Sequence, residues 1–207
     1  MTTPARFITF EGIDGSGKST QSRLLSEALE ASGYTVCRTR EPGGSNGAEE
    51  IRRLLVEGDP NRWSAETEIL LFTAARRDHL EQRIQPALAR GEIVVSDRFA
   101  DSTRVYQGAT RGDLRATVDG LHDLMIGTEP DLTFIIDMDP EVALRRGLAR
   151  RSGEDRFEDF GADFQVKLRA GFLALAKDAP DRCLVIHGGR PPEEVAKEVL
   201  SLAKDRL

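Results

Sequence analysis

Five short apolar runs, rich in β-branched and aromatic residues, predict five strands. They lie at residues 7–10, 35–38, 93–96, 132–136 and 183–186. Between them, apolar residues recur every three or four positions, which is typical of amphipathic helices. Strands that alternate with helices predict a parallel sheet with helices on both faces. We therefore expect a three-layer α/β/α fold with a five-stranded parallel sheet.

The ends of several predicted helices carry residues that are typical of helix termini. Gly33 and Gly91 close two of them, because glycine readily adopts the left-handed conformation found there. Asp139 and Pro140 begin a third helix, with Asp139 as its N-cap. The stretch PPEE at residues 191–194 opens the last one. In such a fold, ligands bind beyond the carboxyl ends of the strands.

Length and composition favour a globular chain of one domain. The 207 residues include 39% hydrophobic and 31% charged positions, and no repeat or linker interrupts the pattern. We expect a single domain over residues 1–207, with a lid segment at about 145–158. The net charge of −6 argues against partners such as nucleic acid or an anionic membrane.

Both cysteines, Cys37 and Cys183, lie inside predicted strands. This placement favours buried thiols in a reducing compartment over a disulfide framework or a metal site. The N-terminus lacks a secretory apolar region, and no apolar run is long enough to span a membrane. We therefore expect a cytoplasmic protein.

The segment between the first predicted strand and the first predicted helix has the pattern of a phosphate-binding loop. It matches G-x-x-x-x-G-K-[ST] at every fixed position and is followed by Thr20; its residues are Gly12, Ile13, Asp14, Gly15, Ser16, Gly17, Lys18 and Ser19. Glycines let backbone N–H groups converge on phosphate, and the helix N-terminus adds positive potential. We expect ATP here, with Lys18 bridging the β- and γ-phosphates and Ser19 ligating Mg²⁺.

Asp14 places a negative charge inside this anion-binding loop. A carboxylate that faced the phosphates would repel them in a low-dielectric site. We therefore expect Asp14 to point away from the phosphates and to accept a hydrogen bond from the second substrate, the phosphoryl acceptor. The alternative is a solvated carboxylate that pairs with a nearby arginine.

Four further motifs follow the loop: TREPGGS at 39–45, LLFTAARRDH at 70–79, VVSDRFADSTRVYQG at 94–108 and ARRSGEDRFE at 149–158. The guanine-reading N/T-K-x-D stretch of GTPases is absent from the sequence. Together with FEGIDGSGKST at 10–20, the motifs closely resemble those of the thymidylate kinase family. The resemblance implies a nucleoside monophosphate kinase-like P-loop fold that transfers the γ-phosphoryl group of ATP to dTMP, giving ADP and dTDP, with Mg²⁺.

Phe72 and Arg76 lie one turn apart on one face of a predicted helix. An aromatic ring can stack on a base, and a guanidinium group can donate to a base carbonyl. Taken alone, the pair is more typical of a core phenylalanine beside an arginine that extends to solvent. The resemblance implies instead that both residues contact thymine.

Thr103, Tyr106 and Gln107 share a helical face, and we count the neighbouring Ser102 with them as substrate-binding. The resemblance implies that these residues contact thymine or close off the sugar. Tyr106 would then occupy the space that a ribose 2′-OH needs, which favours deoxyribose. An ordinary half-buried tyrosine is the alternative.

Asp97 and Arg98 follow a predicted strand. A carboxylate there can orient Mg²⁺ and its waters, and an arginine can bind a phosphate with two hydrogen bonds. A simple ion pair is the alternative. The resemblance implies that Arg98 holds the dTMP phosphate and that Asp97 serves the metal. Arg40 resembles a second ligand of this phosphate, and we expect Glu41 to orient it.

Five arginines gather near the end of the matched region: Arg145, Arg146, Arg150, Arg151 and Arg156. A solvated basic face is their ordinary explanation, and a lid that closes over ATP is the functional one. Some family members carry an arginine just after the acidic residue of the phosphate loop, where this chain has Gly15. We therefore expect the lid to supply the catalytic cation, with Arg150, Arg151 and Arg156 as candidates.

Two other functions stay open at this point: a P-loop kinase for another nucleotide or nucleoside, and a P-loop ATPase switch. The switch would leave Phe72, Arg76 and Tyr106 without a role. The resemblance also implies a homodimer. The apolar stretches at 69–75 and 121–126 are candidates for its interface, but they fit a buried core equally well.

Overall fold

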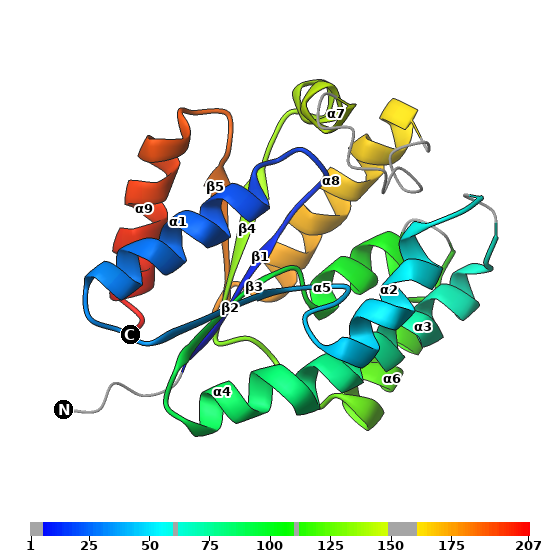
Figure 1. Cartoon of the computed structure of the whole chain (residues 1–207). Coiled ribbons are helices and arrows are strands. Elements are labelled where there is room, and N and C mark those ends of the chain that lie inside the picture. Colours follow the sequence, from blue (N-terminus) through cyan, green and yellow to red (C-terminus); the bar gives the residue numbers. More distant parts are fainter. Residues whose placement is uncertain (1–5, 60–61, 110–111, 149–160) are drawn as a thin grey trace.

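The computed structural model describes residues 6–59, 62–109, 112–148 and 161–207, and its strands form a five-stranded parallel sheet (Figure 1). The strands are β1 (Arg6–Glu11), β2 (Val36–Arg40), β3 (Ile93–Asp97), β4 (Leu132–Asp137) and β5 (Cys183–His187). They lie in the order β2-β3-β1-β4-β5, and every neighbouring pair is parallel. Each strand overlaps one predicted run, so the predicted α/β class and parallel sheet are confirmed.

The described helices are α1 (Lys18–Ala31), α2 (Asn46–Val56), α3 (Ala65–His79), α4 (Gln85–Ala89), α5 (Ala100–Thr103), α6 (Arg115–Met125), α7 (Pro140–Leu148), α8 (Gly161–Asp178) and α9 (Pro192–Lys204). Two π-helical segments, η1 (Leu80–Ile84) and η2 (Arg104–Ala109), continue α3 and α5. Gly33 and Gly91 have φ of 90° and 79°, which confirms the predicted glycine ends. Asp139 caps α7, because its Oδ1 accepts a hydrogen bond from the Glu141 N–H at 2.9 Å.

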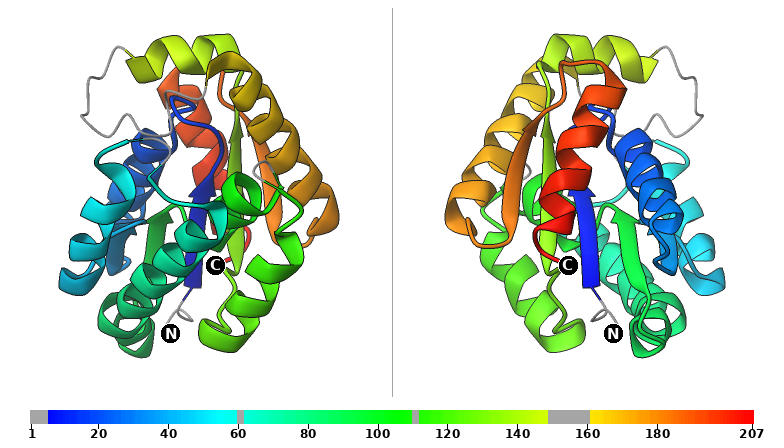
Figure 2. Two further views of the ribbon diagram at one scale, coloured as in Figure 1. Left: turned by 90° about the vertical axis from the view of Figure 1, so that its right-hand side faces the viewer. Right: turned by 90° about the vertical axis from the view of Figure 1, so that its left-hand side faces the viewer.

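Helices cover both faces of the sheet because successive strand residues point to opposite sides (Figures 1 and 2). On one face, Leu29 of α1 and Val199 of α9 are buried against Phe10 of β1. On the other face, Phe7 of the same strand packs with Leu80 of η1. The helix α8 also lies against this sheet, beside β4 and β5.

Cys37 on β2 and Cys183 on β5 are buried and free, as predicted. Burial raises the pKa of the Cys183 thiol to about 12, so this thiol stays protonated at neutral pH. Within the described ranges, no helix combines the length and the apolar character needed to cross a membrane.

The register of three strands gathers the predicted motifs at one edge of the sheet. Asp97 at the end of β3 pairs with Phe10 of β1 on one side and with Arg40 of β2 on the other. The phosphate loop, the TREPGG segment and the Asp97–Arg98 segment therefore leave the sheet side by side.

Candidate active site

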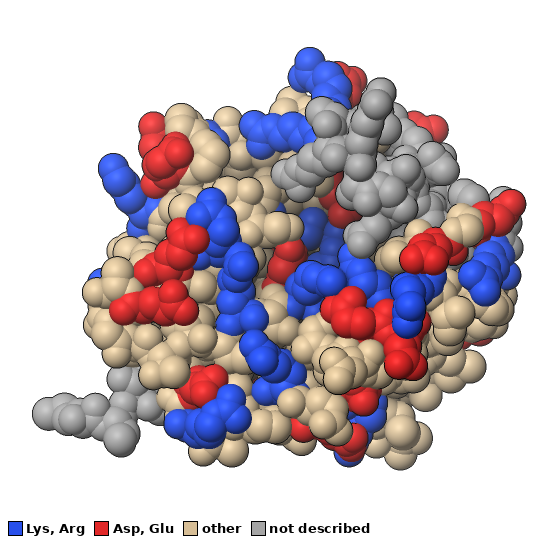
Figure 3. All heavy atoms as spheres, viewed as in Figure 1, with Lys and Arg blue, Asp and Glu red and all other residues tan. Residues whose placement is uncertain are grey.

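A cavity of about 440 Å³ opens at this edge of the sheet. Most of the predicted site residues line it: Asp14, Gly15, Gly17, Lys18, Ser19, Arg40, Phe72, Arg76, Asp97, Arg98, Ser102, Thr103, Tyr106 and Gln107. Lys and Arg side chains gather around the hollow at the centre of the face shown in Figure 3. The candidate lid residues Arg150, Arg151 and Arg156 lie outside the described residues. Arg145 and Arg146 are exposed on α7.

Two glycines of the phosphate loop make approaches that a side chain would block. Gly12 has φ 134°, and a Cβ atom there would lie 2.6 Å from the carbonyl oxygen of Ile136. Gly15 has φ 80°, and its Cβ would lie 2.0 Å from the carbonyl oxygen of Ala143 on α7. No arginine fits at position 15 in this packing. This finding is in keeping with our expectation that the catalytic cation comes from elsewhere.

Lys18 is buried at the start of α1, where its Nζ donates to the carbonyl oxygen of Ile13 at 2.8 Å. Burial and the positive charge of Arg98 lower the pKa of Lys18 to about 8. The ammonium charge is therefore costly without a bound anion. A phosphate would stabilise the charged form, which is the behaviour expected of a phosphate-binding lysine.

Asp14 lines the cavity and pairs with Arg98. Its Oδ2 accepts from the Tyr106 hydroxyl at 2.7 Å, and Lys18 Nζ lies 3.7 Å from its Oδ1. Burial acts to raise the pKa of Asp14, but the charges of Arg98 and Lys18 outweigh it and lower the pKa to about 2. The ion pair between Asp14 and an arginine, which was the alternative interpretation, is thus present. The Asp14 carboxylate in this pair is nevertheless not an ordinary surface group.

Arg98 is held in an unusual backbone conformation by a buried glutamate. Its φ is 72°, in the left-handed region that side chains rarely adopt. Glu11, at the end of β1, accepts from the Phe99 N–H at 2.7 Å and from the Ser102 hydroxyl at 2.6 Å. Ser102 in turn accepts from Arg98 Nη1 at 2.8 Å. Burial and the nearby charge of Asp101 raise the pKa of Glu11 to about 7.

Asp97 and Ser19 both line the cavity and fit a role in holding a divalent cation. The buried Oδ1 of Asp97 has no hydrogen-bond partner among the described residues. A carboxylate oxygen of this kind is a suitable ligand for Mg²⁺, which usually takes one or two protein carboxylates together with substrate phosphates. The described residues contain no cluster of three or more His, Cys, Asp or Glu side chains that would hold a metal by themselves.

Arg76 is buried and fixed by hydrogen bonds at two of its three nitrogens. Its Nε donates to Glu41 Oε2 at 2.8 Å, and its Nη2 donates to the Phe99 carbonyl oxygen at 3.1 Å and to Thr103 Oγ1 at 3.0 Å. The second oxygen of Glu41 lies 3.0 Å from Nδ1 of the fully buried His79. Arg76 is therefore held rigidly at the cavity wall.

The expectation that Glu41 orients Arg40 is wrong. Arg40 Nη2 lies 3.0 Å from Glu49 Oε1, and its Nη1 donates to the Pro42 carbonyl oxygen at 2.9 Å. Neighbouring residues of an extended chain point to opposite sides, so Glu41 turns inward to Arg76 while Arg40 stays near the surface.

Gln107 is buried beside the cavity, where its Nε2 donates to Glu68 Oε2 at 3.0 Å. Glu68 belongs to α3, the helix that also carries Phe72 and Arg76. All three α3 side chains therefore face the region that the sequence assigned to the base.

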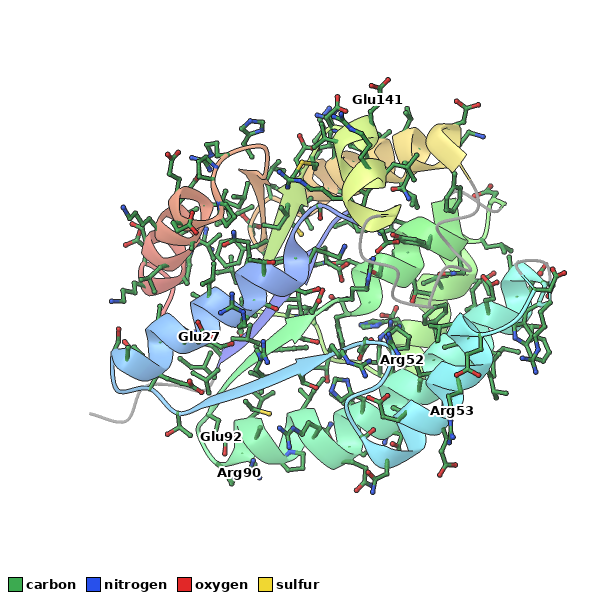
Figure 4. The ribbon with its side chains drawn as sticks, turned by 45° about the horizontal axis from the view of Figure 1, so that its top comes forward. Glu27, Arg52, Arg53, Arg90, Glu92 and Glu141 are labelled. Atoms are coloured by element: carbon green, nitrogen blue, oxygen red, sulfur yellow. The ribbon has the colours of Figure 1, made fainter. Side chains whose placement is uncertain are left out.

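Three residues with clear contacts to the site received no role from the sequence: Glu11, Glu68 and Arg52. Arg52 lines the cavity from α2, whereas Arg53 lies on the outer side of that helix (Figure 4). Glu68 could have been suspected, because it is a charged residue directly beside the apolar run Ile69–Phe72. Glu11 has the same feature at the end of an apolar strand.

Known proteins resemble the chain over almost its whole length. The family model described as thymidylate kinase matches residues 10–199. The thymidylate kinase of Dinoroseobacter shibae is 73% identical over 201 residues, covering 97% of both chains, and that of Caulobacter vibrioides is 50% identical over 206 residues, covering 99% of both. A crystal structure of thymidylate kinase from Ehrlichia chaffeensis, 40% identical, matches with a TM-score of 0.77 and covers 96% of this chain and 98% of that chain. A match of this extent in sequence and in structure means that the chain belongs to the thymidylate kinase family.

Proposed function

We propose that the protein transfers the γ-phosphoryl group of ATP to dTMP, giving ADP and dTDP. The observation that carries this proposal is a single cavity shared by the phosphate loop and by a wall suited to a base, formed by the half-buried Phe72 and the buried Arg76 and Gln107. Arg98 lines the same cavity, where it pairs with Asp14 of the loop and donates to Ser102. The arrangement suits two nucleotides that meet at their phosphates.

The acceptor in this reaction is a phosphate monoester, whose second pKa is about 6. It is therefore largely dianionic at neutral pH and needs no general base. One of its oxygens forms a bond to the γ-phosphorus while the bond from that phosphorus to the β–γ bridging oxygen breaks, and the electron pair leaves with ADP. The protein contributes positioning and charge neutralisation.

Each cation has a proposed place in that step. Arg98 and Arg40 bind the dTMP phosphate, and Lys18 contacts the β- and γ-phosphates of ATP. Asp97 and Ser19 would hold Mg²⁺, which would neutralise charge on the ATP phosphates. Our assignment of the last cation to the lid, at Arg150, Arg151 or Arg156, stays a prediction.

We assign the remaining site residues to the nucleoside of dTMP. Phe72 stacks on thymine, and Arg76, Thr103 and Gln107 read its edge. Asp14 accepts from the sugar 3′-OH, and Tyr106 fills the space of a 2′-OH. The hydrogen bond from Tyr106 to Asp14 supports this arrangement because it places both side chains at one point of the cavity.

An acceptor screen with ATP and Mg²⁺ tests the proposal. Initial rates of ADP formation are measured with dTMP, dUMP, dCMP and thymidine. We expect dTMP to be preferred, and a preference for thymidine would contradict the proposal because it would make a hydroxyl group the acceptor. An ATPase switch, the other class of function, predicts ATP turnover without any acceptor.

We also propose a homodimer formed through α3 and α6. These helices pack against each other and expose apolar side chains: Leu70 is 58% exposed, Leu124 78% and Met125 41%. Burial of such groups against a second copy would be favourable. Sedimentation of the wild type and of Leu124→Glu tests the assembly, since the glutamate should favour monomers. The single domain over 1–207 and the cytoplasmic location stay predictions, the latter supported by the free thiols.

A further inference from the structure

Glu68 and Gln107 form a hydrogen bond inside the wall of the cavity. Glu68 Oε2 accepts from Gln107 Nε2 at 3.0 Å, and the two side chains are 0% and 1% exposed. The reaction proposed above does not require Glu68. A buried carboxylate is expensive, so its presence here calls for a functional explanation.

The hydrogen bond determines which way round the Gln107 amide lies. The NH₂ end of the amide donates to Glu68 and therefore faces it. The carbonyl end, Oε1, is then the end that remains for a ligand in the cavity lined by Gln107. Without Glu68 the amide could turn over and present its NH₂ group instead.

Arg76 supplies the complementary group on the same wall. Its Nε and Nη2 are occupied by Glu41, Phe99 and Thr103, whereas Nη1 has no hydrogen-bond partner within the described part of the chain. Arginine only donates hydrogen bonds. The wall therefore offers a donor at Arg76 Nη1 and an acceptor at Gln107 Oε1.

We propose that Glu68 is a positioning residue that sets base specificity by fixing the Gln107 amide with its oxygen toward the substrate. A pyrimidine with a 4-oxo group and an N3–H matches the donor and acceptor of the wall. A 4-amino pyrimidine places a donor against Arg76 and an acceptor against Gln107, so that both contacts fail. This inference rests on the proposed function, since it concerns the same site and reaction.

Glu68→Gln tests the proposal, because its own amide can hydrogen-bond to either orientation of Gln107. The measurement is kcat/KM for dTMP and for dCMP at saturating ATP. We expect the dTMP-to-dCMP ratio to fall by about 10- to 100-fold, since buried hydrogen-bonding groups account for much of such discrimination. The KM for ATP should stay the same. A parallel loss with both acceptors and an unchanged ratio would overturn the proposal.

Two further variants complete the experiment. Glu66→Gln removes the same charge from an exposed position of the same helix and should leave the ratio unchanged. In a Gln107→Leu background, Glu68→Gln should change the ratio no further, because the proposed effect of Glu68 on the ratio depends on the orientation of that amide. An additional change of the same size would overturn the proposal.

Glu68→Asp serves if Glu68→Gln does not fold. Its shorter side chain withdraws the acceptor from the amide, so the ratio should fall in the same direction, and an unchanged ratio counts against the proposal. If the proposed function were wrong, the result would be different, because the wild-type protein itself would not phosphorylate dTMP. A wild type that uses dTMP but loses no selectivity on mutation contradicts only the role of Glu68.

Discussion

Arg76 and Glu41 form an ion pair that is almost completely buried, with Nε 2.8 Å from Oε2 and both side chains 4% exposed. Removing one partner leaves the charge of the other buried and uncompensated. We expect Glu41→Ala to lower the free energy of unfolding by about 3–5 kcal/mol, as measured by urea denaturation.

The exposed pair of Arg23 and Glu27 on α1 provides the control. Its side chains are 46% and 54% exposed, so Glu27→Ala should change the free energy of unfolding by no more than about 0.5 kcal/mol. Equal effects of the two substitutions would mean that Glu41 is solvated in solution.

Gly15 and Gly33 have similar backbone angles but different surroundings. Replacing each with alanine therefore separates the cost of backbone strain from the cost of steric overlap. Both have positive φ, 80° and 90°, yet only the Cβ of Gly15 would meet another atom, the Ala143 carbonyl oxygen at 2.0 Å. Gly33→Ala should cost about 1–2 kcal/mol of stability from strain alone. Gly15→Ala should cost at least about 1 kcal/mol more, because α7 must move. Thermal and urea denaturation measure both, and equal costs would show that α7 does not pack on the loop.

The lowered pKa of Lys18, about 8, predicts a dependence of stability on pH in the ligand-free protein. Unfolded lysine titrates near 10.4, so between about pH 8 and 10.4 the unfolded chain binds a proton that the folded chain has lost. The free energy of unfolding should therefore rise with pH in this window, by at most about 1.4 kcal/mol per pH unit. Below pH 8 both states are protonated and the contribution is constant.

Comparison with Lys18→Met isolates this contribution from all other titrating groups. The difference in unfolding free energy between the wild type and Lys18→Met is measured by urea denaturation from pH 7 to 10. We expect the unfolding free energy of the wild type, relative to that of Lys18→Met, to increase as the pH rises above 8. A difference that stays flat would mean that the Lys18 pKa is ordinary in the folded state.

The three central strands, β1, β3 and β4, were predictable from the sequence because they are buried on both faces. Residues 7–10 and 93–96 are apolar apart from Thr9 and Ser96, which is the pattern that strands with helices on both sides require. The phosphate loop was predictable because its glycines and Lys18 are fixed by local geometry. The helix α2 was not predicted, since much of its surface is exposed and its apolar repeat is short.

Contacts between charged or polar groups that lie far apart in the chain could not be predicted from the sequence. The partner of Glu41 is 35 positions away in Arg76, and the partner of Glu68 is 39 positions away in Gln107. Spacing along one helix or strand does not encode such pairs, because they depend on how α3 packs against η2 and against the segment that follows β2. Adjacency in sequence even suggested the wrong partner for Arg40.

Asp14 should matter for dTMP far more than for ATP, because its carboxylate is paired with Arg98 and Tyr106 on the acceptor side. For Asp14→Asn we expect kcat/KM for dTMP to fall about 100-fold, as misplaced reacting groups commonly cause. The KM for ATP should change by less than about threefold, since this interaction belongs to the other substrate. Steady-state kinetics with each substrate varied in turn measure both, with the exposed Asp205→Asn as control. A selective loss of ATP affinity would place the carboxylate beside the ATP phosphates instead.

Tyr106 should decide between deoxyribose and ribose through the volume of its ring. The residue is only 5% exposed, and its hydroxyl is held by Asp14 at 2.7 Å, so the ring has little freedom to move aside. Tyr106→Ala opens this space, and we expect the ratio of kcat/KM for dTMP to that for ribothymidine 5′-monophosphate to fall about tenfold or more. Tyr106→Phe keeps the ring and loses only the hydroxyl group with its hydrogen bonds to Asp14 and Arg98, so it should use dTMP less efficiently at an unchanged ratio. If Tyr106→Ala kept the wild-type ratio, the sugar would be selected elsewhere in the cavity. If Tyr106→Phe changed the ratio, the selection would depend on the hydroxyl group of Tyr106.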